Sequence, residues 1–332
     1  MAPSGQGRAA RVALRAIPGP ARNTPPPRRV RVDTMRTIPP SRLDPRLYQI
    51  ACLGALLLYG VGWRSFDVSP AQIVLTLGAA VAAQAVGSRW AGLPAFDAKS
   101  ALISGLSLCL LLRVDASWLA AAAALVAVGS KFLLRWNGKH VFNPTNLGVA
   151  AVVALSDRAW VSPAQWGAGP TIAFLVACLG GMVVNRAARS DVTYAFLGSY
   201  AAILFGRAAW IGQPWSVPLH QLESGSLLLF SFFMISDPKT TPNARAARVL
   251  FGALVAAGAA FVAFVLFKPS GPIWSLVALS PMVPLLDRFF PGRRYEWTRP
   301  TAGNLSKGDI HETMVAGPRA LAGGRALGVE RA

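Results

Sequence analysis

The sequence predicts an all-α integral membrane protein, and three observations lead to this fold class. Of 332 residues, 53% are hydrophobic and only 14% are charged, whereas soluble domains carry about 25% charged residues. The apolar residues are gathered into long runs, as in membrane-spanning helices. Nearly all charged residues lie between those runs or at the two ends of the chain. We therefore expect a multi-pass protein of the cell (inner or plasma) membrane.

Ten apolar segments are expected to form about ten transmembrane helices. They are residues 48–63, 70–88, 98–112, 116–134, 145–156, 168–184, 193–206, 222–236, 249–267 and 272–287. The shortest, 98–112, 145–156 and 222–236, fall below the ~20 residues that a perpendicular helix requires. Such segments are typical of broken or re-entrant helices that line a site. Boundaries misplaced by a few residues would give the same pattern.

Composition divides the chain into three parts. Residues 1–47 are rich in Arg and Pro and are predicted to form a disordered, basic cytoplasmic arm. Residues 48–290 form the predicted membrane domain, and residues 291–332 form a basic cytoplasmic tail that is also expected to be disordered. The arm contains no apolar run long enough for a signal peptide. The sequence leaves open whether translation starts at Met1 or Met35.

The distribution of positive charge predicts the orientation. The chain carries 33 Lys and Arg against 14 Asp and Glu, a net charge of +19. With the N-terminus in the cytoplasm, the opposite side of the membrane holds only Arg64, Arg113, Arg158, Arg207 and Lys268. The positive-inside rule therefore places both termini in the cytoplasm. We attribute the charge to topology and to anionic lipid at the cytoplasmic face, and expect no nucleic-acid partner.

The ionisable residues also limit the chemistry. We place no Asp or Glu in the middle of a predicted span, which argues against a self-sufficient ion pump. The cysteines at 52, 109 and 178 are scattered without a CxxC spacing, and the three histidines fall in loops or the tail. We therefore predict no metal site and no haem held by paired histidines.

Three polar motifs lie at the predicted cytoplasmic face, and the first is "FDAKSALISGLSLCLLLR" at 96–113. Asp97 precedes the first turn of a helix, where a negative charge complements the helix dipole. Ser100, Ser104 and Ser107 follow the i, i+4, i+7 spacing and share one helix face. That face serves either helix–helix contact or the lining of a ligand site.

The second motif is "KHVFNPTNLG" at 139–148. Asn143 precedes Pro144 and is therefore expected to be extended, with Thr145 or Asn146 placed to cap the next helix. Two amides and a helix N-terminus can donate hydrogen bonds to a phosphate or to the carbonyl-rich edge of a flavin ring. A purely structural turn and cap is the alternative interpretation.

The third motif is "FFMISDPKTTPNARAAR" at 232–248. The Asp237–Pro238 pair is predicted to end the segment 222–236, because a residue before proline is driven out of the helix. Thr240 and Thr241 offer caps for the helix that follows, and Lys239 holds the turn on the cytoplasmic side. A stop-and-restart turn accounts for the proline and the lysine. It does not account for a carboxylate at the tip of an aromatic-rich helix.

In this order and spacing, the three motifs resemble the NqrB/RnfD family, the multi-span subunits of the sodium-pumping NADH:quinone oxidoreductase and of the Rnf electron-transport complex. The resemblance rests on "DAKSALISGLSL", "FNPTNLG" and "FFMISDPKTTP" and covers about residues 45–290. It implies a ten-span bundle of two inverted five-helix repeats, similar to the urea-transporter architecture. It also implies a flavin, and other membrane or redox subunits as partners.

The family carries FMN attached to the threonine of a Ser-Gly-Ala-Thr motif, and NqrB carries riboflavin as well. This sequence has no such motif, and its nearest strings, at 223–230 and 268–274, lack the threonine. The expectation is therefore a non-covalent FMN or riboflavin. Its candidate contacts are Asp97, Ser104, Asn143, Thr145, Asn146, Asp237, Lys239 and Thr240. The chain also resembles the accessory membrane proteins found beside enediyne biosynthesis genes, as a divergent relative.

Three functions follow as hypotheses. The first is a membrane subunit of an Rnf/Nqr-like electron-transport system, with a flavin coupling redox chemistry to transmembrane transport. The alternative is a transporter or channel for a small solute on the same scaffold, without a redox cofactor. The third is a structural anchor for a biosynthetic complex. The sequence identifies no catalytic residue and leaves open whether the protein is an enzyme.

Overall fold

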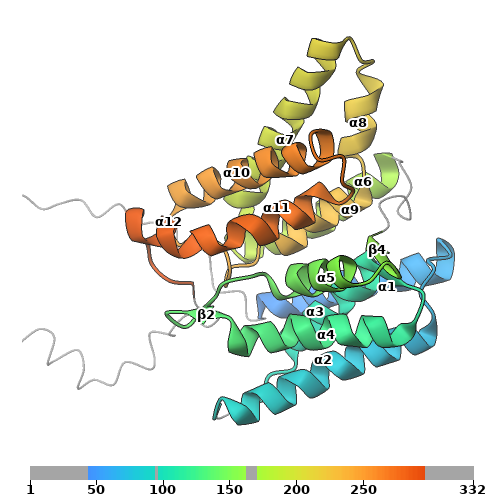
Figure 1. Cartoon of the computed structure of the whole chain (residues 1–332), viewed down its shortest axis with the longest axis vertical. Helices are drawn as coiled ribbons and strands as arrows, with labels where there is room; N and C mark the ends of the chain where they lie inside the picture. Colours follow the sequence, from blue (N-terminus) through green and yellow to red (C-terminus); the bar gives the residue numbers. More distant parts are fainter. Residues whose placement is uncertain (1–43, 94–95, 162–169, 296–332) are drawn as a thin grey trace, which may run out of the picture. The chain divides into compact units, whose positions relative to one another are not determined.

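The computed structural model describes residues 44–93, 96–161 and 170–295, and within these ranges the chain is mostly helical. The predicted arm up to residue 43 and the tail from residue 296 lie outside the described residues. The helices of the first half are α1 (Pro45–Trp63), α2 (Pro70–Trp90), α3 (Lys99–Leu111), α4 (Ser117–Leu133) and α5 (Pro144–Leu155) (Figure 1).

The second half contains a longer list of elements. They are α6 (Pro170–Arg186), α7 (Ser190–Ile211), α8 (Ser216–Leu222), α9 (Gly225–Leu229), the π-helical turn η2 (Phe230–Met234), α10 (Arg245–Phe264), α11 (Gly271–Leu279), the 3₁₀ turn η3 (Ser280–Met282) and α12 (Val283–Phe289). Each predicted segment overlaps one helix or one run of consecutive helices. Among the described residues, α2, α7 and α10 are long and apolar enough to cross a membrane, and the other apolar helices are shorter.

Three helices begin with the same local device. α1, α2 and α5 each carry a proline at the first helical position, preceded by a residue whose side chain accepts a hydrogen bond from the backbone of the first turn. The caps are Asp44, Ser69 and Asn143. Such a cap contributes about 1 kcal/mol, and proline is pre-organised at this position. The prediction that Thr145 or Asn146 caps α5 is therefore wrong, because the proline makes Asn143 the capping residue.

Two short antiparallel strand pairs join the helices. β1 (Leu112–Val114) pairs with β4 (Ala159–Val161), so the end of α3 lies beside the end of α5. β2 (Arg135–Trp136) pairs with β3 (Lys139–His140) around Asn137 and Gly138, both at positive φ. An Asn-Gly pair suits a tight hairpin turn because these residues tolerate the left-handed conformation. These strands are a small departure from the all-α prediction.

Within each half, the helices pack on one another in the same order. In the first half α2 packs on α4, α4 on α5, and α1 on α3. In the second half α7 packs on α10, α10 on α11, and α6 on α9 and η2. Glycines allow the close approaches: a Cβ added to Gly148 would meet the Ala123 carbonyl oxygen at 2.5 Å, and one on Gly252 the Val192 carbonyl oxygen at 2.8 Å.

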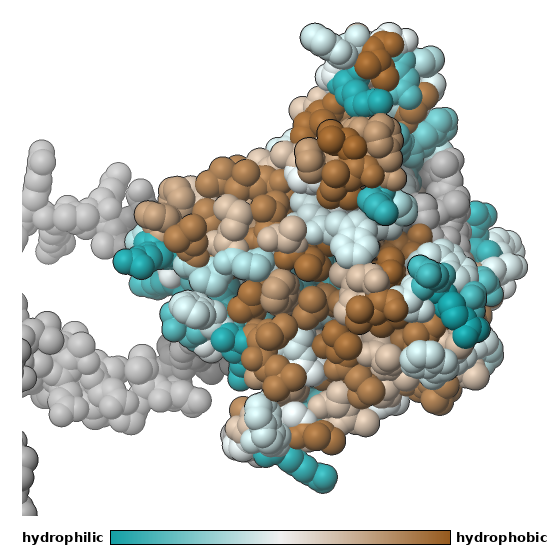
Figure 2. Space-filling model, in the orientation of Figure 1, coloured by the Kyte–Doolittle hydropathy of each residue, from teal (hydrophilic) through white to brown (hydrophobic). Residues whose placement is uncertain are grey.

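Many large apolar side chains lie on the surface. Figure 2 shows apolar residues spread over this face of the helices, with hydrophilic residues gathered mainly near helix ends. The exposed apolar residues include Val74 and Val86 on α2, Leu125 on α4 and Phe261 on α10. Extensive exposed apolar surface is unfavourable in water and suits contact with lipid.

Candidate functional site

A cavity of about 120 Å³ is lined mainly by polar side chains. We call it the polar cavity. Its walls come from α1, α3, α4, α6, the start of α5, and the turn that follows η2. Its charged and polar lining includes Arg46, Ser100, Lys131, His140, Asn143, Asp237 and Lys239.

The structure brings most of the predicted flavin contacts to this cavity. The predicted residues that line it are Ser104, Asn143, Thr145, Asp237 and Lys239. Within the described part of the chain, the lining does not include Asp97, Asn146 or Thr240. Asp97 is joined to the cavity through Arg46, a lining residue whose guanidinium donates a hydrogen bond to the Asp97 carboxylate. The same carboxylate accepts the backbone N–H of Lys99.

Asp237 is the carboxylate of the cavity. Its Oδ1 accepts the backbone N–H of Lys239 at 3.0 Å, and its Oδ2 accepts Nδ2 of Asn143 at 3.4 Å. Among the described residues no Lys or Arg lies within ion-pair distance of it. Burial raises the pKa of Asp237, while the Lys239 N–H and the charge of Lys131 oppose that rise. The group is therefore a half-buried acid held by neutral donors.

Asn143 holds the site together. Its Oδ1 caps α5 by accepting the Asn146 N–H at 2.9 Å, and its Nδ2 donates to the Met234 carbonyl at 3.0 Å. The same amide therefore fixes the start of α5, the end of η2 and the position of Asp237. Asn146 has a different role, since its Nδ2 donates to the Ile273 carbonyl of α11 at 3.0 Å. Its Oδ1 is buried without a partner in the described part of the chain.

Lys131 is the residue that the sequence interpretation missed. It lies inside α4 with 5% of its surface exposed, and its ammonium donates to the carbonyl and hydroxyl oxygens of Ser100 at 2.9 and 3.0 Å. An ammonium has three N–H groups, so one is left for the cavity. The positive-inside count places Lys131 among the cytoplasmic Lys and Arg residues, because it is not one of the five on the opposite side. A lysine within an Ala-rich apolar segment was the available signal, because ionisable residues inside such helices are functional candidates.

His140 completes the polar lining. Burial, together with the nearby positive charges of Arg135, Lys131 and Lys239, lowers the pKa of His140 to about 4. The imidazole is therefore neutral at neutral pH. Its Nδ1 is buried without a partner among the described residues.

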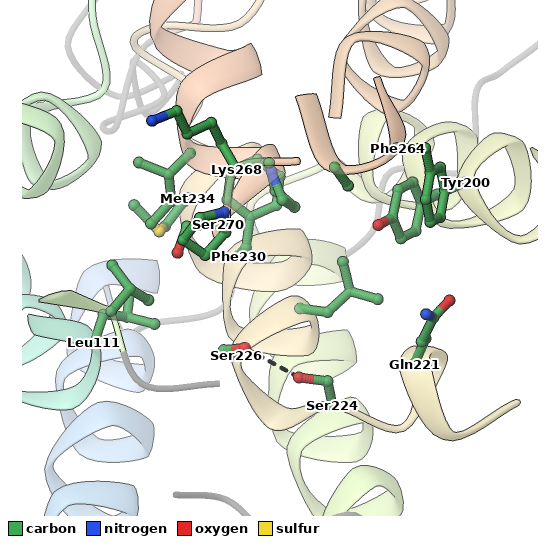
Figure 3. Close-up of a pocket in the computed structure, with 17 residues that line it drawn as sticks. Leu111, Tyr200, Gln221, Ser224, Ser226, Phe230, Met234, Phe264, Lys268 and Ser270 are labelled. Atoms are coloured by element: carbon green, nitrogen blue, oxygen red, sulfur yellow. Dashed lines mark hydrogen bonds between the residues drawn. The ribbon is translucent and has the colours of Figure 1, made fainter. Parts of the chain in front are cut away.

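A second and larger cavity, of about 340 Å³, adjoins η2. We call it the aromatic cavity, after Tyr200, Phe230 and Phe264 in its walls (Figure 3). Phe230 and Met234 of η2 line the aromatic cavity, whereas Phe233 lines the polar cavity. None of the predicted flavin contacts lines the aromatic cavity.

The π-helical turn between the cavities has a local cause. The N–H of Ile235 bonds to the Phe230 carbonyl at 3.0 Å, one residue further back than in an α-helix. The Ser231 carbonyl that an α-helix would use accepts the hydroxyl of Thr193 on α7 instead, at 2.8 Å. Such turns occur frequently at functional sites.

Comparison with known proteins identifies relatives of this chain. Residues 158–296 match the NQR2, RnfD, RnfE family. Three relatives are named as the same component of an ion-translocating oxidoreductase complex. The protein from Tolumonas auensis is 31% identical over 101 residues, 30% of this chain and 29% of the relative. The protein from Erwinia tasmaniensis is 28% identical over 153 residues, 42% of this chain and 43% of the relative.

The third relative aligns over more of its length. The protein from Stutzerimonas stutzeri is 27% identical over 316 residues, 72% of this chain and 86% of the relative. The chain thus spans less than half the length of the first two relatives and most of the third. The family match contains Asp237 and η2. The match over residues 158–296 and the three relatives support membership of the NQR2, RnfD, RnfE family.

Proposed function

We propose that this chain is a membrane subunit of an Rnf-like electron-transport system and that its polar cavity holds the edge of a non-covalent flavin, FMN or riboflavin. The three relatives are named as members of an ion-translocating oxidoreductase complex. The observation that carries the proposal is a pair of opposite charges in one cavity, Lys131 and Asp237, that are not paired with each other.

The donors and acceptors of the cavity complement a flavin imide. That edge presents an N–H between two carbonyls. Asp237 accepts a hydrogen bond from the N–H, and Lys131 donates its remaining N–H to a ring carbonyl. The positive charge of Lys131 favours added negative charge on the ring, which raises the reduction potential. A bound flavin supplies the electron transfer, and the protein supplies binding and electrostatics.

The volume of the polar cavity limits how much of a flavin it can hold. At about 120 Å³ it is smaller than the ~300–1,000 Å³ of typical ligand sites. It accommodates the imide edge, and the rest of the ring system requires the long side chains of Arg46 and Lys239 at its wall to move. Attachment through a phosphoester to Ser-Gly-Ala-Thr is not proposed, because the chain lacks that motif.

We also propose the wider architecture. The repeated packing order of α1–α5 and α6–α11 supports ten spans in two inverted halves. Such repeats place binding sites at discontinuous helices between the halves, and the polar cavity lies between the start of α5 and the end of η2. Both termini lie in the cytoplasm, anionic lipid contacts that face, and other membrane or redox subunits are the partners.

The experiment is an absorbance spectrum of the full chain purified in neutral detergent. We expect flavin bands, and we expect acid precipitation to release the flavin into the supernatant. A colourless protein with a cooperative thermal transition would contradict the proposal. Flavin that stays in the acid pellet would contradict the non-covalent assignment alone.

One observation favours the alternative function, transport of a small solute without a redox group. The polar and aromatic cavities use different residues of the same turn, η2, so a short wall separates them. Two cavities separated by one turn resemble a gated path. Solute uptake into proteoliposomes by a protein that binds no flavin would establish this alternative.

A further inference from the structure

The aromatic cavity has the composition of a ligand site that is separate from the polar cavity. Phe230, Leu227 and Met234 are buried in its wall, and Phe264 of α10 also lines it. Its volume of about 340 Å³ falls in the range of small-molecule sites. Aromatic walls of this kind contact planar rings by offset or edge-to-face packing.

Tyr200 presents an unsatisfied polar atom to this cavity. The residue is 8% exposed, and its ring stacks on Phe196 with centroids 5.7 Å apart. Its hydroxyl makes no hydrogen bond to any described residue. Figure 3 shows the hydroxyl pointing toward the interior of the cavity. The oxygen is accessible from the cavity, and a tyrosine hydroxyl in an otherwise apolar wall usually has a partner. A ligand oxygen or nitrogen at this point would supply one.

The other end of the cavity favours negative charge. Lys268 lines it, and the ammonium forms no ion pair or hydrogen bond with the described residues. Ser270 precedes α11, and its side chain makes no capping hydrogen bond. The positive end of the α11 dipole therefore faces this region. Figure 3 shows Lys268 and Ser270 on one side of the cavity, with Tyr200 and Phe264 on the other.

The backbone around Lys268 is also unusual. Phe267 and Ser270 have φ angles of 51° and 59°, in the left-handed region that side chains other than glycine rarely adopt. Such conformations are unfavourable and are concentrated at ligand and switch sites. Among the described residues, no Asp or Glu lines the cavity. The site therefore lacks a group that would repel an anion.

We propose that the aromatic cavity binds an aromatic carboxylate that carries a second oxygen at its far end. The carboxylate pairs with Lys268 at the start of α11. The ring lies between Phe230 and Phe264, and the distal oxygen bonds to the Tyr200 hydroxyl. This site does not depend on flavin in the polar cavity, since the two cavities use different residues of η2.

Three matched probes separate the two polar ends of the site. Hydroxybiphenyl carboxylate carries both groups, biphenyl carboxylate lacks the distal hydroxyl, and hydroxybiphenyl lacks the carboxylate. Calorimetric titration of the full chain in neutral detergent measures the affinity for each probe. Removing a hydrogen bond to a charged group weakens binding about tenfold or more. We therefore expect hydroxybiphenyl carboxylate to bind at least about tenfold more tightly than hydroxybiphenyl.

Two substitutions test the residues. Lys268→Met is expected to lower the affinity for both carboxylates about tenfold and to leave the affinity for hydroxybiphenyl unchanged. Tyr200→Phe is expected to lower the affinity for hydroxybiphenyl carboxylate about threefold to tenfold and to leave the affinity for biphenyl carboxylate unchanged. The controls are Arg158→Met, in the turn before β4, and Tyr194→Phe, which is 55% exposed on the same helix as Tyr200. Neither control residue lines the cavity.

Several results would overturn the proposal. If Lys268→Met binds both carboxylates as tightly as the unaltered chain does, Lys268 does not form an anion site. If Tyr200→Phe weakens the binding of both carboxylates equally, the substitution disturbs the structure of the cavity and does not remove a bond to the distal hydroxyl. Displacement of the probe by phosphatidylglycerol but not phosphatidylcholine would reassign the cavity to lipid. If either variant fails to fold, the three probes on the unaltered chain decide, and equal affinities for all three contradict the proposal. The absorbance spectrum for flavin is a separate measurement, so a protein without flavin bands can still be tested with these probes.

Discussion

The polar cavity and the aromatic cavity share the turn η2 but differ in what they bury. The polar cavity is small and contains Lys131 and Asp237, each held by neutral groups. The aromatic cavity is nearly three times larger, and Lys268 is the one cation that the described residues contribute to its wall. Charged side chains are unfavourable in lipid unless they face the protein interior. The difference indicates that charged groups from both halves of the chain meet in the polar cavity, whereas the aromatic cavity is lined mainly by residues of the second half.

The difference has a simple physical origin in the residues that approach η2. From the first half, α4 and the start of α5 bring Lys131 and Asn143 to one face of the turn. From the second half, α7 and α10 bring Tyr200 and Phe264 to another. Substitutions in the polar cavity leave the lining of the aromatic cavity unchanged, so the aromatic cavity serves as an internal reference.

The largest effect is expected from Asp237→Leu. This change removes a carboxylate that shares the cavity with the buried Lys131 ammonium and accepts two hydrogen bonds. Hydrogen bonds to a charged group contribute about 1.5–3 kcal/mol each, so the expected loss is about 3–5 kcal/mol. The double variant Asp237→Leu/Lys131→Met is expected to be more stable than Asp237→Leu alone. Dodecyl sulfate titration measures the free energy of unfolding. Effects of the two substitutions that simply add would show that the charges do not interact.

The next effect is a pH dependence set by His140. Its pKa is about 4 in the folded chain and 6.5 for an unperturbed histidine, so between these values the unfolded chain binds more protons. Stability is therefore expected to fall as the pH drops from about 6.5 to 4, by at most ~3 kcal/mol. His140→Gln removes this contribution, and His220→Gln on the exposed helix α8 is the control. An identical pH dependence in the two variants would contradict the burial of a neutral imidazole.

A smaller loss is expected from Asn143→Ala. The variant loses the cap of α5 and the bond to the Met234 carbonyl, each worth about 1 kcal/mol, so unfolding should become easier by about 2 kcal/mol. Asn185→Ala, at an exposed position on α6, is the control. Thermal unfolding in detergent compares the two. Equal transition temperatures would mean that Asn143 does not connect α5 to η2.

The smallest effect is expected from Thr193→Val. It removes the hydroxyl that donates to the Ser231 carbonyl in the π-helical turn, and a net buried hydrogen bond contributes about 1 kcal/mol. Thr240→Val, whose hydroxyl bonds to the Asp237 carbonyl at 3.3 Å, is the comparison with a longer bond. Thermal unfolding is again the measurement. A larger loss in Thr240→Val would reverse the order predicted here.

Much of the helical pattern could be predicted from the sequence. Apolar runs and cap–proline pairs such as Asn143–Pro144 mark the helix starts, because these signals are local. The short length of segment 222–236 indicates either a broken helix or misplaced boundaries, and the segment contains a five-residue helix followed by the π-helical turn. The number of spans, the inverted repeat and the orientation stay predictions.

The candidate site could be predicted only in part. Asp237 and Asn143 stood out because polar residues interrupt apolar runs, but the bond from Asn143 to Met234 joins positions 91 residues apart. Lys131 looked like a boundary charge because it lies in the last turn of α4. The aromatic cavity has no sequence motif, since its ordinary apolar residues come from separate helices and become a site only through packing.

The measurement that tests the central claim most directly is a flavin titration of three purified full-length proteins: the unaltered chain, Lys131→Met, and Arg89→Met as an exposed charge control. We expect quenching of flavin fluorescence to report binding to the unaltered chain and to Arg89→Met with the same affinity. We expect binding at least about tenfold weaker for Lys131→Met, because a charge-assisted hydrogen bond is lost. Equal flavin affinity of all three proteins would contradict the assignment of flavin to the polar cavity.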